Sequence, residues 1–73
     1  MRELVNEQCR DQALIQFKLG NYVNAMRWYN TAMARTIGHG KSASYESKAK
    51  ECARLAGISW RMDFAKDAEA IHD

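Results

Sequence analysis

The sequence predicts an all-α protein, a small bundle of three to four helices forming a single domain over residues 1–73. Three observations support this prediction. Proline is absent and glycine is sparse, whereas alanine, glutamine, lysine and glutamate are frequent, a composition that favours helix. Apolar residues recur every three to four positions rather than every second one, so no strand is expected. Glycines stand where this periodicity is interrupted, as they do between helices.

Residues 2–19 are expected to form the first helix. Its broad apolar arc contains Leu4, Val5, Cys9, Ile15 and Leu19, with Ala13 and Phe17 at its edges. Leu14 stands off this arc, and the polar residues Gln8, Arg10, Asp11 and Lys18 face water. The broad arc predicts a helix that packs one side on a neighbour.

The second helix is expected over residues 22–36, after an antiparallel helical hairpin that turns at Gly20 and Asn21. Glycine readily adopts the left-handed conformation that closes a helix, and the Asn21 side chain can cap the next one. One face carries Tyr22, Ala25, Met26, Tyr29, Ala32 and Met33, and the other carries Asn24, Arg27, Thr31 and Arg35. Trp28 lies roughly 110° from the centre of the apolar face. It is therefore expected at the rim of the core, as a lid or as an anchor for a partner, and Trp28→Ala is expected to change stability little.

A loop is expected at residues 37–42 and a third helix at 43–56, capped by Ser42 or Ser44. The buried side of this helix is predicted to contain Tyr45, Ala49, Cys52, Ala53 and Ala56. Gly57 is expected to break the helix. A fourth helix at 59–71 would then carry the apolar positions Trp60, Phe64, Ala68 and Ile71.

Charge is distributed unevenly along the chain, although the net charge is only +2. Between residues 18 and 61, eight Lys or Arg residues occur with two acidic ones, and no acidic residue occurs between Gln12 and Tyr45. The last twelve residues are acidic in balance. The basic stretch is either an ordinary solvated surface or a surface that attracts an acidic protein or nucleic acid.

The residues offer no catalytic, metal-binding or cofactor-binding constellation, so an enzyme is not expected. The two histidines and the two cysteines, Cys9 and Cys52, are scattered singly, whereas a metal site needs ligands at close spacing. The cysteines are expected to be small core residues. Apolar runs are far shorter than the roughly 20 residues that cross a membrane, and the amino terminus lacks the apolar core of a signal peptide. A cytoplasmic protein with no membrane contact is expected.

Seven residues carry a resemblance to a known family: Gly20, Tyr22, Ala25, Tyr29 (or Trp28), Ala32, Tyr45 and Cys52. In this pattern the chain resembles the ANR or PerC-like family of small enterobacterial and phage regulators. The resemblance covers roughly residues 13–52. It implies a regulator of transcription that acts through protein contacts with a transcription factor or a nucleoid-associated protein. A basic helical hairpin would suit docking onto an acidic helix of such a partner. The contact residues expected are Arg27, Trp28, Arg35, Lys41 and Trp60.

Two alternatives remain open at this point. The corner from Gly20 to Ala32 also resembles half of a tetratricopeptide unit and the three-helix MIT-like domains of membrane trafficking, which would imply an adaptor that binds an amphipathic peptide. A direct DNA-binding regulator is the other, although Gln16 stands where a recognition corner normally has alanine. A chain this short also often gains stability by pairing, so a homo-oligomer is compatible with the sequence.

Overall fold

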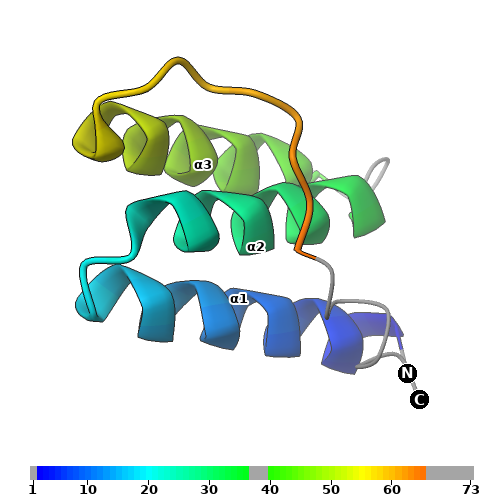
Figure 1. Cartoon of the computed structure of the whole chain (residues 1–73). Coiled ribbons are helices and arrows are strands. Elements are labelled where there is room, and N and C mark those ends of the chain that lie inside the picture. The colour runs from blue at the N-terminus through cyan, green and yellow to red at the C-terminus, as the bar shows by residue number, and fades with distance from the viewer. Residues whose placement is uncertain (1, 37–39, 66–73) are drawn as a thin grey trace.

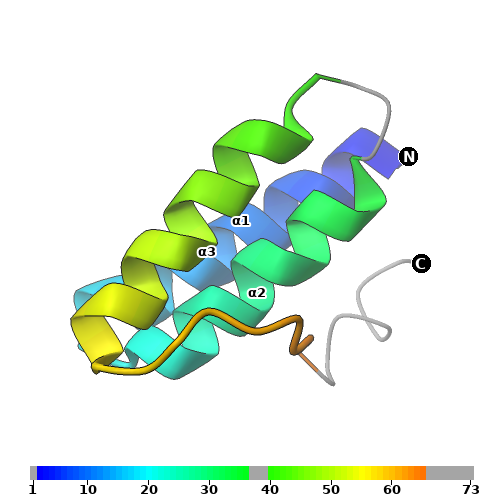
Figure 2. The same ribbon diagram turned by 90° about the horizontal axis from the view of Figure 1, so that it is seen from above.

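The computed structural model describes residues 2–36 and 40–65, with side-chain positions from residue 7 onward. Within these residues α1 spans Arg2–Lys18, α2 spans Tyr22–Arg35 and α3 spans Ser42–Ala56. None of the described residues lies in a strand, so the prediction of an all-α fold is confirmed. Figure 1 shows α2 between α1 and α3, and Figure 2 shows that α1 and α3 run in the same direction. The two outer helices each pack on α2.

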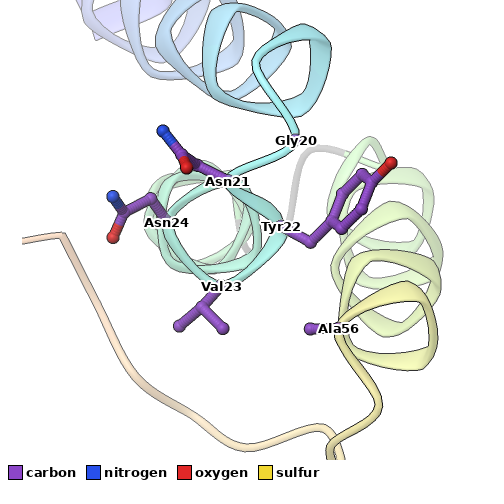
Figure 3. Close-up of a pocket in the computed structure, with 6 residues that line it drawn as sticks. All are labelled: Gly20, Asn21, Tyr22, Val23, Asn24 and Ala56. Atoms are coloured by element: carbon purple, nitrogen blue, oxygen red, sulfur yellow. The ribbon is translucent and has the colours of Figure 1, made fainter.

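The connection between α1 and α2 turns at Gly20, whose φ of 83° is left-handed. The Gly20 N–H donates to the Phe17 carbonyl at 3.0 Å, and the Asn21 N–H donates to the Gln16 carbonyl at 2.9 Å. This pair of bonds is the Schellman arrangement that closes a helix. Asn21 does precede α2, but its side chain does not cap the helix. The side-chain Nδ2 of Asn21 donates to Gln16 Oε1 at 3.0 Å. Figure 3 shows Asn21 and Asn24 directed away from α3, whereas Tyr22 points toward it.

The carboxyl end of α3 repeats this arrangement at Gly57, whose φ is 75°. The Gly57 N–H donates to the Arg54 carbonyl, and the Ile58 N–H donates to the Ala53 carbonyl. The predicted break at Gly57 is therefore confirmed. At the amino end of α3, the expected serine caps are wrong, since Lys41 precedes the helix and no side chain caps it.

Residues 58–65, here called the strap, are not helical. The expected fourth helix at 59–71 is therefore wrong over its described part, and residues 66–71 lie outside the described residues. In Figure 1 the strap leaves the end of α3 and crosses α2 toward α1. It follows an irregular path because side chains of α2, rather than its own backbone, bind its carbonyl groups.

The core confirms the expected apolar face of α2 but extends well beyond it. Ala25, Met26, Tyr29, Ala32 and Met33 are buried, as predicted, and Tyr22 is half-buried. Trp28, Asn30 and Thr31 are buried as well, although the helical pattern placed Trp28 at the rim and Thr31 on the outer face. The reason is that α2 is the central helix, with α1, α3 and the strap all packed against it.

The buried face of α1 is displaced toward one edge of the expected arc, the edge that carries Ala13 and Phe17. Cys9 and Ala13 are fully buried and Phe17 is half-buried, whereas Ile15 and Leu19 are 49% and 67% exposed. Leu4 and Val5 lie outside the residues with described side chains. Because α1 contacts only α2 closely, a single strip of its surface is covered.

A substitution at Ala25 would show how tightly α2 packs against its neighbours near the turn between α1 and α2. It is fully buried, so Ala25→Leu is expected to lower the free energy of unfolding by roughly 1–3 kcal/mol through overpacking. Ala34→Leu, on an exposed position of the same helix, is the matched control and should change stability by less than about 0.5 kcal/mol. Urea unfolding followed by circular dichroism measures both. Equal effects in the two variants would contradict close packing at Ala25.

Candidate protein-binding groove

A groove lies between α1 and α3 and is called here the α1–α3 groove. It has a volume of about 170 Å³ and is lined by Leu14, Phe17, Tyr29, Lys48, Glu51 and Cys52. This volume is below the roughly 300–1,000 Å³ typical of small-molecule sites. It suits an apolar side chain of another protein better than a cofactor.

Aromatic rings form the floor of the groove and its continuation along α2. Tyr29 stacks on Tyr45 of α3 with ring centroids 6.4 Å apart. Seven residues before Tyr29, Tyr22 packs edge to face on Phe17 of α1, with ring centroids 5.3 Å apart. Such pairs contribute about 0.5–1.5 kcal/mol beyond the area they bury. The aromatic pairs therefore stabilise the packing beneath the groove.

Leu14 and Lys48 form the exposed rim of the groove. The Leu14 residue lines the groove and is 40% exposed. Lys48 is exposed and makes no ion pair with a described residue. Glu51 is different, because Arg54 donates hydrogen bonds to both of its carboxylate oxygens and thereby lowers its pKa. The rim thus presents an apolar side chain and a cation that has no ion-pair partner among the described residues.

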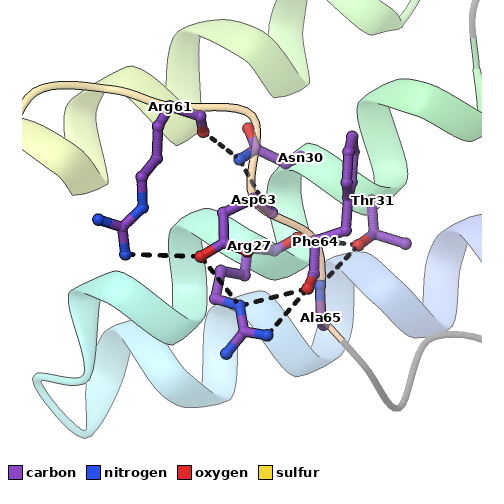
Figure 4. A network of polar contacts seen from close by, with 7 residues as sticks. All are labelled: Arg27, Asn30, Thr31, Arg61, Asp63, Phe64 and Ala65. Carbon is purple, nitrogen blue, oxygen red and sulfur yellow. Dashed lines mark hydrogen bonds and ion pairs between the residues drawn. The ribbon is translucent and has the colours of Figure 1, made fainter.

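The opposite side of α2 is occupied by the strap. Asn30 is fully buried, and its Nδ2 donates to the carbonyl oxygens of Arg61 and Asp63, both at 2.8 Å (Figure 4). Its Oδ1 accepts a hydrogen bond from Trp60 Nε1 at 3.0 Å. The Ala65 N–H donates to Thr31 Oγ1 at 3.2 Å. These contacts bind the strap to α2 through its main chain.

The five residues expected to contact a partner do not form one surface. Trp28 is only 8% exposed and belongs to the core, so its placement at the rim is wrong. Arg27 donates to the Phe64 carbonyl oxygen at 3.0 Å and lies 3.6 Å from the Asp63 carboxylate. Trp60 is bound to Asn30, and the Lys50 ammonium lies 5.0 Å from its ring centroid. Arg27 therefore binds the strap, and Trp60 is the strap residue whose indole binds α2.

The remaining two expected contact residues lie away from the strap contacts. Lys41 is exposed and directly precedes α3. Arg35 is partly buried in the last turn of α2, where its charge acts on Cys9. The groove itself was not predicted. Its one signal in the sequence was Leu14, an apolar residue standing off the arc of its own helix.

A second hollow lies at the turn between α1 and α2, with a volume of about 360 Å³ (Figure 3). Its lining is Gly20, Asn21, Tyr22, Val23, Asn24 and Ala56, and no charged side chain is among these residues. It is an open depression beside a helix end. It offers neither an acid–base pair nor a nucleophile.

Cys9 and Cys52 are free thiols buried in the core, as expected for small core residues. Burial raises the pKa of both, and that of Cys52 rises to about 11. A thiol in this state is a poor nucleophile and a poor metal ligand at neutral pH. Among the described residues no group of three His, Cys, Asp or Glu side chains is placed to bind a metal ion. His39 and His72 lie outside these residues.

The pKa of Cys52 makes stability depend on alkaline pH. Because the folded-state pKa lies above the ordinary value of 9.0, Cys52 contributes stability below about pH 9. This contribution is lost as pH rises from about 9 to 11. We expect the difference in unfolding free energy between wild type and Cys52→Ala to shrink over this range in urea titrations. A difference that stays constant would show that the thiol does not titrate differently on folding.

None of the described helices combines the length and the hydropathy needed to cross a bilayer. Comparisons with protein-family models, with curated proteins and with solved structures found no match to this chain.

Proposed function

We propose that this chain is a small non-enzymatic regulator of transcription that acts in the bacterial cytoplasm through protein–protein contacts. Its partner is a transcription factor or a nucleoid-associated protein. The observation that supports protein contact is the α1–α3 groove, where an exposed leucine and a lysine without an ion pair to any described residue border an aromatic floor. An apolar side chain of a partner that fills such a pocket would serve as an anchor of the interface.

The role in transcription rests on the resemblance to ANR or PerC-like regulators. In the structure, the residues that carry this resemblance are mostly internal. Tyr29 and Cys52 line the α1–α3 groove, and Tyr45 stacks on Tyr29. Gly20 makes the turn that lets α1 and α2 pack together. The shared pattern thus corresponds mainly to the core and the turn, and two of its residues, Tyr29 and Cys52, line the groove.

Direct DNA binding has less support than protein binding. Recognition of duplex DNA needs several Lys or Arg side chains directed at phosphates. Arg27 and Arg61 both lie within 3.6 Å of the Asp63 carboxylate, and Lys50 pairs with Glu46 at 2.8 Å. Three cations of the basic stretch are therefore occupied within the protein.

The test is capture of partners from nuclease-treated bacterial lysate by the tagged full chain, with identification by mass spectrometry. Leu14→Gln removes the apolar rim, and Ile15→Gln is the matched control because Ile15 is similarly exposed but does not line the groove. We expect wild type and Ile15→Gln to recover a transcription factor or nucleoid protein, and Leu14→Gln to lose it. Circular dichroism checks that both variants fold.

Three other outcomes would contradict parts of this proposal. Equal capture by Leu14→Gln would exclude the groove as the contact surface. Capture that disappears with nuclease treatment would favour the direct DNA-binding regulator. Specific capture of a partner unrelated to transcription would favour the peptide-binding adaptor.

A further inference from the structure

The α1–α3 groove has the geometry of an empty helix position in a bundle. The outer helices α1 and α3 run in the same direction, and each packs on α2 (Figure 2). Contacts between α1 and α3 themselves are few, so the surface above Tyr29 is left open. A further helix lying between them would complete a four-helix arrangement, in which side chains of each helix fill the spaces of its neighbours.

The polar groups available favour a helix over an extended peptide in this groove. An extended peptide leaves its N–H and C=O groups in need of partners, whereas a helix bonds them internally. The protein itself shows what binding an extended segment requires, since Arg27, Asn30 and Thr31 all bond main-chain groups of the strap. The charged groups lining the groove are Lys48 and Glu51, and Glu51 is bound by Arg54. No comparable row of polar side chains is present there.

The apolar side chains that line the groove on α1, together with Leu55 beside it on α3, are spaced for a helical ligand. Leu14 and Phe17 lie one turn apart on α1 and line the groove. On α3, Leu55 follows Cys52 by three residues and Lys48 by seven, so it lies on the same face as both. It is 39% exposed. A helix with apolar residues at positions i, i+3 or i+4, and i+7 could contact both walls at once.

The charges near the groove favour an acidic ligand. Lys48 lines it without an ion pair to a described residue, and Lys18 lies one turn beyond Leu14 on α1. Arg10 lies one turn before Leu14, shares an exposed pair with Asp11, and acts electrostatically on Tyr29. Asp11 and Glu51 both have arginine partners, whereas Glu7, two turns before Leu14 on α1, is exposed and pairs with no described residue. A ligand carboxylate would therefore meet cations on both walls.

We infer that the α1–α3 groove binds an amphipathic helix whose apolar side packs between Leu14 and Leu55 and whose flanking Asp or Glu side chains face Lys48. This inference rests on the proposed function and specifies the element of the partner that is recognised.

The experiment uses the full chain and three synthetic 18-residue peptides, the number being about five helical turns. The first has leucines at heptad spacing flanked by glutamates, the second has lysines in place of the glutamates, and the third is a scrambled form of the first. Binding is measured by calorimetry and by amide chemical shifts. We expect the glutamate peptide to bind at least about fivefold more tightly than the lysine peptide, with shifts confined to α1, α3 and Tyr29. Its affinity should fall as salt is added.

Substitutions in the protein identify which groove residues contact the peptide. Lys48→Glu is expected to reverse the preference between the two charged peptides, and Leu14→Gln to weaken both by about tenfold. Ile15→Gln should bind like wild type. Equal binding of the scrambled peptide, or no preference between glutamate and lysine, would overturn the inference. So would self-association that Leu14→Gln abolishes, because the occupant would then be a second copy, or groove shifts produced by duplex DNA.

Failure of the inference that the groove binds an amphipathic helix is distinguishable from failure of the proposed role in transcription. If the peptides do not bind but Leu14-dependent capture of a transcription factor persists, the regulatory proposal stands and only the helical ligand is wrong. If the glutamate peptide binds in the groove but the captured protein has no role in transcription, the inference stands and the regulatory role is wrong.

Discussion

Trp28→Ala is expected to lower the free energy of unfolding by about 3–5 kcal/mol. The side chain is 8% exposed and belongs to the same core cluster as Ala25, Met26 and Tyr29. Its removal would leave a large cavity on the central helix, which has covering elements on several sides. A chain of this length has a total stability of roughly 4–11 kcal/mol. The variant should therefore be partly or wholly unfolded at 37 °C, as measured by thermal and urea unfolding.

Two controls distinguish the large loss of stability expected for a buried Trp28 from the small change expected for a Trp28 at the rim of the core. Trp28→Phe keeps most of the apolar volume and should cost clearly less than Trp28→Ala. Ile15→Ala, at a half-exposed position, should cost under about 1 kcal/mol. A Trp28→Ala variant that melts like wild type but no longer captures its partner would support the original interpretation of Trp28 as a contact residue.

Asn30→Ala is expected to release the strap and to lower the free energy of unfolding by about 2–4 kcal/mol. The carboxamide satisfies the carbonyl oxygens of Arg61 and Asp63 and the indole N–H of Trp60. With alanine there, the two carbonyls and the indole either stay buried without partners or leave α2 to reach water. Urea unfolding measures the loss. Trypsin cleavage after Arg61, followed by mass spectrometry, measures the release of the strap.

The matched control for this variant is Asn24→Ala, at an exposed asparagine of the same helix. It should change neither stability nor the rate of cleavage. Asn30→Asp keeps the shape but replaces the two donors with a carboxylate facing two carbonyl oxygens, so it should destabilise the protein at least as much. Unchanged cleavage after Arg61 in Asn30→Ala would show that apolar contacts of Ile58 and Trp60 hold the strap without Asn30.

The strap and the groove lie on opposite sides of α2, and this separates two kinds of variant. Substitutions at Asn30 or Arg27 are expected to act on stability. Substitutions at Leu14 or Lys48 alter exposed side chains and are expected to act on partner binding. The basic residues of α2 illustrate the distinction. Arg27 was expected to contact a partner because it is charged, yet its guanidinium bonds the Phe64 carbonyl oxygen within the chain.

Helical periodicity predicted the parts of the fold that depend on neighbours in the sequence. The bounds of the three helices differ from the expected ones by a single residue each. The left-handed glycine that closes α1, and the break at Gly57, follow from the conformational freedom of glycine. The inner face of α3, from Tyr45 to Ala53, was also predicted correctly. Each of these features is decided within one or two helical turns.

The predictions of burial from helical periodicity were wrong where other elements pack against more than one side of a helix. A periodic pattern identifies the most apolar face and treats the rest as exposed, which suits α3 but not α2. Trp28, Asn30 and Thr31 are covered by elements whose positions are not encoded in the pattern of α2. The same reasoning explains the strap. Its apolar residues at four-residue spacing predicted a helix, but Asn30 and Arg27 bind its carbonyl groups in a non-helical path.

The sequence by itself thus determined that the protein is helical, where α1, α2 and α3 begin and end to within one residue, and which side of α3 is buried. Hydrogen bonds between residues four apart and glycine conformation suffice for this. The tertiary structure alone decided that α2 is covered on the Asn30 side, that the strap crosses it, and that Leu14 and Lys48 border one groove. Asn30 and Asp63 are 33 residues apart in the chain. Contacts at such a separation depend on how whole elements pack, so the pattern of residues within one helix does not predict them.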